Sequence, residues 1–168
     1  MPIRLCKASL IAAIALLMTL VAFNNITDYD DNWMFVQHVM GMDTIFPHST
    51  ELWRAVTFSP VQRIAYLAII LVEAVSAFLL ILASAALVRS AKSAPDFERA
   101  VPLAALGLTS ALLLYGAGFL AVGGEWFLMW QSKSWGGSDA AARFFLVIAA
   151  VLVVMLTGRE ATDSATPQ

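Results

Sequence analysis

The chain has 168 residues, of which 60% are hydrophobic and only 13% are charged, and its mean hydropathy is +0.78. Soluble domains contain roughly 45–50% apolar and about 25% charged residues, so this chain is too poor in charge to cover a soluble surface and too apolar to be disordered. The net charge of −2 argues against a nucleic-acid-binding protein, and the single cysteine, Cys6, excludes a disulfide framework. A small polytopic membrane protein is the class that remains.

Four apolar segments are long enough to cross a bilayer, because a hydrocarbon layer of about 30 Å takes about 20 helical residues. They predict an all-α fold, an antiparallel four-helix transmembrane bundle that forms one domain over residues 1–168. The expected spans are residues 8–23, 61–88, 101–122 and 140–157. The outer segments are then 24–60 and 123–139, and the inner loop is 89–100.

The first apolar segment has two interpretations. Arg4 and Lys7 precede an apolar core, as in a cleaved signal peptide. No small-residue cleavage site follows, because the core runs directly into Phe23, Asn24 and Asn25. We therefore favour an uncleaved helix.

Lysine and arginine placement predicts the orientation of the bundle, because cytoplasmic loops carry an excess of these residues. Cytoplasmic N- and C-termini in a bacterial inner membrane would place six cations inside: Arg4, Lys7, Arg89, Lys92, Arg99 and Arg159. Four would lie outside: Arg54, Arg63, Lys133 and Arg143.

The first outer segment, 24–60, is acidic and contains a pattern typical of a short amphipathic helix. Between Asn32 and Met40, apolar residues recur at Trp33, Val36 and Met40. A second short helix is expected over 51–57. All five tryptophans of the chain lie in the two outer segments, whereas a general aromatic belt would mark both membrane surfaces. We therefore expect the outer segments to pack together as an apolar cap.

Glu73 is the most distinctive residue within a predicted span. It lies about 14 Å from Ile64 along the helix, which predicts a position near the bilayer midplane. A carboxylate there is costly and should face the bundle, where we expect a hydrogen bond from Tyr115 of the third span. The functional interpretation is a proton relay, an ion site or a headgroup contact; the structural one is a neutral acid that joins two helices.

The outer segments contain further candidate functional residues. His38, Asp43 and His48 lie close in sequence and, with Glu125, predict a mixed nitrogen and oxygen metal site as one alternative. The spacing matches no standard metal motif, and an interfacial histidine is the other interpretation. No catalytic motif is present, so we assign no catalytic, cofactor-binding or metal-binding residue and expect no cofactor. The candidate functional residues are Glu73, Tyr115, His38, Asp43, Glu125, Trp126 and Trp130.

Small residues recur along one face of the third span, at Gly107, Ala111 and Gly118. Such residues let a neighbouring helix approach closely in a membrane. We expect ordinary helix packing at this face.

Several stretches resemble a bacterial family of predicted small integral membrane proteins of unknown function. They are NNITDY at 24–29, FVQHVMGMDTIFP at 35–47, GFLAVGGEWFLMWQS at 118–132 and AARFF at 141–145. The resemblance implies a four-helix inner-membrane protein and transfers no activity, cofactor or catalytic residue. It adds candidates for a shared outer site: Asn24, Asn25, Thr27, Asp28, His38, Asp43, Glu125 and Gln131.

Three functions fit the sequence. The favoured one is an accessory or interaction protein of a larger membrane complex, with the tryptophan-rich cap as contact surface and the lipid bilayer or a homo-oligomer as further partners. A small transporter or lipid-handling protein that uses Glu73 is the second. A membrane enzyme or metal site in the outer cap is the third.

Overall fold

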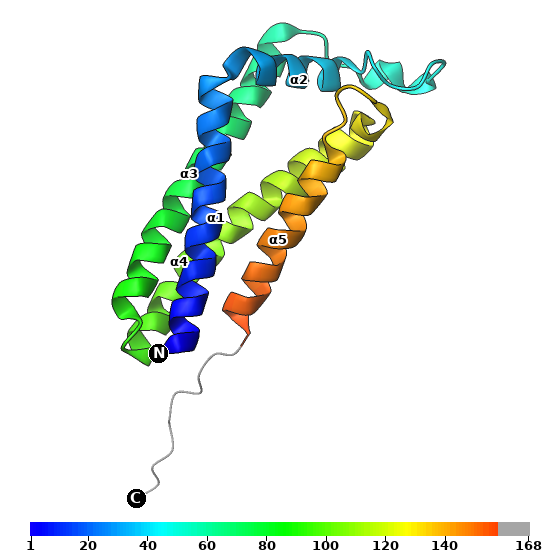
Figure 1. Cartoon of the computed structure of the whole chain (residues 1–168). Helices are drawn as coiled ribbons and strands as arrows, with labels where there is room; N and C mark the ends of the chain where they lie inside the picture. The colour runs from blue at the N-terminus through cyan, green and yellow to red at the C-terminus, as the bar shows by residue number, and fades with distance from the viewer. Residues whose placement is uncertain (158–168) are drawn as a thin grey trace, which may run out of the picture.

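The structure, a computed structural model, describes residues 1–157, and Arg159 of the orientation argument lies outside them. The described chain is all-helical, as the sequence predicts (Figure 1). Four of its helices are long and apolar enough to cross a membrane. They are α1 (Pro2–Thr27), α3 (Ser59–Ser90), α4 (Ala94–Leu113) with its continuation η2 (Leu114–Trp126), and α5 (Ser138–Leu156).

The spanning helices extend beyond the predicted apolar segments because polar residues continue their ends. Asn24, Asn25 and Thr27 belong to the last turn of α1 instead of an outer loop. The predicted inner loop is mostly helical, because the Ser93 side chain accepts a hydrogen bond from the Asp96 backbone N–H and starts α4 there. Only residues 91–93 separate α3 from α4.

One end of the bundle is closed by two cationic side chains of α1. The Arg4 guanidinium donates to the Ala91 carbonyl at 3.2 Å, and the Lys7 ammonium donates to the Thr157 carbonyl at 3.0 Å. Cations are favourable partners of the free carbonyls at helix C-termini. The start of α1, the α3–α4 connection and the end of α5 therefore meet at this end, which we call the inner end (Figure 1).

The helix formed by α4 and η2 changes its packing partner along its length. A Cβ added at Gly107 would lie 2.9 Å from Leu80 Cγ of α3, so α4 and α3 are closely packed. A Cβ added at Gly116 would lie 2.9 Å from Phe145 Cε2 of α5. A Cβ added at Gly118, by contrast, would meet only Leu114 of its own helix. The predicted row of small residues therefore packs against a neighbouring helix at Gly107 but not at Gly118.

Because η2 packs along α5 and barely touches α3, the two pairs of helices diverge toward the outer end of the bundle (Figure 1). The η2 segment has π-helical hydrogen bonds, such as Phe127 N–H to the Val122 carbonyl at 3.0 Å. π-Helical turns are rare and frequently occur at functional sites. Helix α2 (Tyr29–Gly41) runs across the outer end, above the widening space (Figure 1).

The outer cap (residues 28–58 and 127–137) joins the two outer segments, as the sequence predicts. It contains α2 and two short helical turns, η1 (Thr50–Arg54) and η3 (Met129–Gln131). Val39 and Met42 pack with Phe127 and Met129 in a small core of their own. Polar contacts and ring contacts also connect the segments: Thr44 with Ser132, Phe46 with Gln131 and Trp130, His38 with Trp135, and Trp53 with Trp126 of η2.

Candidate functional site

The carboxyl group of Glu73 is held by the last turn of α1. Glu73 is 1% exposed, and the Asn25 side-chain amide donates to its Oε2 atom at 2.8 Å. The Tyr66 hydroxyl, which lies two helical turns before Glu73 on α3, donates to the Asn25 backbone carbonyl at 2.8 Å. Asn25 therefore occupies a defined position between two side chains of α3.

Aromatic rings hold this network in place where α1 meets α2. The Tyr66 ring contacts the rings of Tyr29 and Trp33, with centroids 4.9 and 6.1 Å apart. The Arg63 guanidinium lies 5.4 Å from the centre of the Trp33 ring, an arrangement typical of a cation–π contact. Trp33 thus packs on α3 beside the predicted site instead of contacting η2.

Tyr115 of η2 does not form the hydrogen bond to Glu73 that the sequence predicted. Its side chain is buried, with the residue 3% exposed, and its ring contacts Phe119 and Phe144. The hydroxyl has no hydrogen-bond partner within residues 1–157. The prediction was wrong because α1 is longer than its apolar core, so Asn25 reaches the carboxyl instead. An unpartnered buried hydroxyl costs about 1–3 kcal/mol.

Glu73 and Tyr115 line a common cavity of about 220 Å³ beneath α2. Its other polar walls are Asn25, Asn32 and Tyr66, and α5 closes one side with Ala141 and Phe144. We call it the polar cavity because five of its wall residues are polar, although most of the wall is apolar. It contains one carboxyl group and no lysine or arginine side chain.

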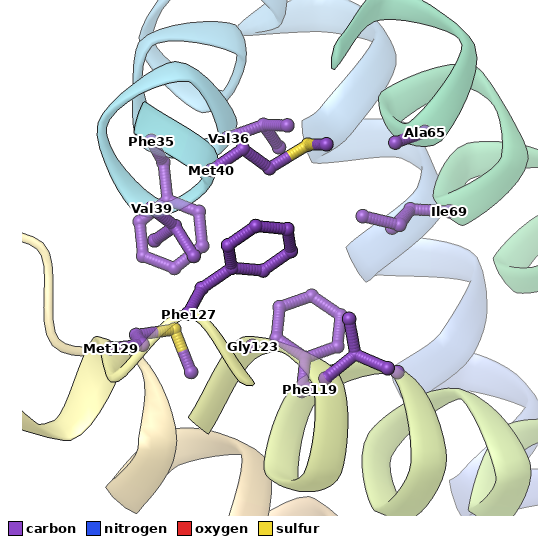
Figure 2. A pocket seen from close by; sticks show the side chains of 12 residues that line it. Phe35, Val36, Val39, Met40, Ala65, Ile69, Phe119, Gly123, Phe127 and Met129 are labelled. Carbon is purple, nitrogen blue, oxygen red and sulfur yellow. The ribbon is translucent and has the colours of Figure 1, made fainter. Parts of the chain in front are cut away.

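A second cavity, of about 230 Å³, adjoins the first and is apolar (Figure 2). The ring of Phe127 lies at the centre of the side chains that line this cavity, between α2 and η2 (Figure 2). The two cavities share four wall residues: Phe35, Val36, Ile69 and Phe119. Together they reach the size of small-molecule pockets, which is about 300–1,000 Å³ and combines apolar walls with a few polar groups.

The site lies toward the outer end of α1. Asn25 follows Lys7, whose ammonium lies at the inner end, by about 27 Å of helix. This length is close to the thickness of a hydrocarbon layer, about 30 Å, so the Asn25–Glu73 pair lies toward the outer end of the bundle. The apolar cavity extends farther out along η2, because Val122, Gly123 and Phe127 line it, whereas the polar cavity is lined on this helix by Tyr115 and Phe119.

The other candidate residues lie in the outer cap or, for Glu125 and Trp126, at the end of η2, and none of them lines the polar cavity. The His38 Nδ1 atom lies 2.8 Å from Asp43 Oδ2, and the His38 ring stacks on Trp135 at 4.5 Å. Glu125 is exposed and does not join this pair. No three His, Cys, Asp or Glu side chains among residues 1–157 are placed to hold a metal ion, so this pair lacks the third ligand that the metal alternative required.

Trp126 and Trp130 connect parts of the cap. Trp126 contacts Trp53, and the Arg54 guanidinium lies 5.4 Å from the centres of both indole rings. Trp130 packs edge-on against Phe46. Trp126 thus holds η1 against η2, and Trp130 holds η3 against the first outer segment.

A known protein family matches nearly the whole described chain. A family model for predicted small integral membrane proteins, DUF2165, matches residues 3–157. The chain belongs to this family. The DUF2165 match includes all four spanning helices and the outer cap, so this chain is an integral membrane protein throughout. No curated protein and no solved structure matches it.

Within this DUF2165 protein, the residues proposed for a shared outer site do not converge. Asn25 enters the polar cavity, whereas Asn24, Thr27 and Asp28 are exposed at the end of α1. The Gln131 side-chain oxygen accepts a hydrogen bond from the Phe46 N–H at 3.1 Å, inside the cap. Sequence reasoning did not assign Asn25 to Glu73, although the buried face of α1, at Ile14, Met18 and Ala22, continues to it with helical spacing.

Proposed function

We propose that this protein is a lipid-handling membrane protein that binds a small amphiphilic molecule in the paired cavities beneath α2. The observation that carries the proposal is the shared wall between an apolar cavity and the polar cavity, whose five polar side chains give it the hydrogen-bonding groups that the apolar cavity lacks. An amphiphile has this same division, so one molecule can place its apolar body and its polar group in adjoining compartments.

The depth of the two cavities favours a molecule that is taken up from the bilayer over a resident phospholipid. A phospholipid of the outer leaflet has its polar group on the outside, but here the apolar cavity is the outer one. The cap shelters that cavity from water with Val39, Phe127 and Met129. The divergence of η2 from α3 leaves Ala65 and Val122 at the rim, where a molecule in the membrane can enter sideways.

A photoreactive alkyl chain tests this function in proteoliposomes. A methyl-terminated alkyl diazirine should label Phe127 and Met129 in the wild-type protein. Ala65→Phe fills the apolar cavity and should abolish this labelling. Ala74→Phe is the matched control, because Ala74 is exposed on the opposite face of α3. Labelling spread evenly over lipid-facing residues, or unchanged labelling in Ala65→Phe, would contradict the proposal.

We propose as a second function an accessory role beside a larger membrane complex, with the outer cap as the contact surface. Large aromatic side chains remain uncovered there, with Trp53 70% and Trp130 52% exposed. Aromatic anchors of this kind are enriched at protein interfaces. A photoreactive amino acid placed at Trp130 in native membranes should cross-link one defined protein. Cross-links to lipid alone would refute this role.

We also propose that the protein lies in a bacterial inner membrane with cytoplasmic termini. The support is the cation distribution, with Arg4, Lys7, Arg89 and Lys92 gathered at the inner end. The outer cap would then face away from the cytoplasm.

A further inference from the structure

The polar cavity limits the kind of polar group that its ligand can carry. This inference rests on the proposed lipid-handling function and concerns the head of the bound molecule. Glu73 is the acidic side chain of the wall, and no lysine or arginine lines it. An anionic head buried beside Glu73 would therefore have no cation to compensate its charge.

Glu73 and Tyr115 each have hydrogen-bonding capacity that is not used within the cavity wall. Within residues 1–157, Asn25 alone hydrogen-bonds to the Glu73 carboxyl, through Oε2, which leaves Oε1 as an acceptor. The buried Tyr115 hydroxyl has no partner among these residues and is a donor as well as an acceptor. A ligand that satisfies both Oε1 and the proton of the Tyr115 hydroxyl must donate one hydrogen bond and accept another.

We propose that the bound amphiphile is an alcohol whose hydroxyl group donates to Glu73 and accepts from Tyr115. A hydroxyl is the smallest group that has both capacities. A carboxylate only accepts, an ammonium only donates, and a methyl group does neither. The apolar body of the alcohol passes between Phe35 and Phe119, which belong to both cavities, and ends beside Phe127.

Four photoreactive probes of equal chain length test this inference on the full-length protein in proteoliposomes. They end in a hydroxyl, a carboxylate, an ammonium or a methyl group. The hydroxyl probe should label the residues around Phe127 most strongly, by about tenfold over the methyl probe, which is the effect of a net hydrogen-bond gain of ordinary size. Preference for the carboxylate or the ammonium probe would overturn the inference.

The Tyr115→Phe variant identifies the group responsible for the preference. It removes the hydroxyl and keeps the ring, so the hydroxyl probe should lose most of its advantage over the methyl probe. Unchanged methyl-probe labelling shows that the variant is folded. Tyr29→Phe is the control, because Tyr29 lines neither cavity. A full hydroxyl preference in Tyr115→Phe would contradict the assigned contact.

The outcomes separate the two proposals. Equal labelling by hydroxyl and methyl probes at the cavity residues would refute the alcohol and leave the lipid-handling function standing. Failure of every probe to label the cavity residues would refute the lipid-handling function itself.

Discussion

The contact between Asn25 and Glu73 predicts a measurable coupling between α1 and α3. The Asn25 amide is the hydrogen-bond donor to a carboxyl that is 1% exposed, at 2.8 Å. Interhelical hydrogen bonds in membranes average about 0.6 kcal/mol and reach about 1.7, and bonds to charged groups in soluble proteins reach about 3. Asn25→Leu keeps the side-chain volume but leaves the carboxyl unpartnered. We therefore expect it to lower the free energy of unfolding by about 1–2 kcal/mol.

A double-mutant cycle separates this contact from a general effect on the bundle. Glu73→Leu removes the group that needs a partner, so the double variant Asn25→Leu, Glu73→Leu should be more stable than Asn25→Leu alone. The expected coupling energy is about 1 kcal/mol. Asn24→Leu is the matched control, because Asn24 is exposed on the same turn of α1.

Reversible unfolding in mixed micelles, followed by helical circular dichroism, measures each corner of the cycle. Effects of the two substitutions that add within about 0.3 kcal/mol would show that the pair does not interact, and the reasoning from the hydrogen bond would fail. An equal loss of stability in Asn24→Leu would assign the effect to the helix end instead of the carboxyl.

Two further predictions concern the packing and the orientation of the bundle. Gly107→Ala should destabilise the protein by about 1–3 kcal/mol, because the new Cβ would lie 2.9 Å from Leu80 Cγ. Gly41→Ala, with no atom within 4 Å, should change stability by less than about 0.5 kcal/mol in the same assay, and equal effects would contradict the close contact of α3 and α4. Ser134→Cys in a Cys6→Ala background should react with a membrane-impermeant maleimide added to intact cells. Reaction only after permeabilisation would reverse the proposed orientation.

The spanning helices were predictable because the bilayer selects for long apolar segments, which hydropathy detects directly. Their ends were less predictable, since polar residues can continue a helix beyond the hydrocarbon. Asp96 and Arg99 made the start of α4 look like a loop, although their side chains form an ion pair within its first turns. Asn24 and Asn25 made the last turn of α1 look like an outer segment for the same reason.

The candidate site was predictable only in part. Glu73 and Tyr115 were identified because a polar side chain within a span is costly and stands out. Their partners depend on the axial register of one helix against another, and hydropathy carries no information on register. The assignment of Asn25 to Glu73 required the length of α1, and the depth of the pair required the contacts of Lys7 at the inner end.

The cavities themselves follow from the way in which a single long helix is packed. Gly107 holds α4 against α3 near the inner end, and Gly116 holds η2 against α5 farther out. The two glycines lie on different faces of the helix, because a Cβ added at Gly107 would meet α3 and one added at Gly116 would meet α5. A helix attached to α3 by one face and to α5 by the other must leave α3 as it rises, and α2 then covers the space that opens. The paired cavities are therefore a consequence of the packing that holds the bundle together, and closing them would require η2 to lose its contact with α5.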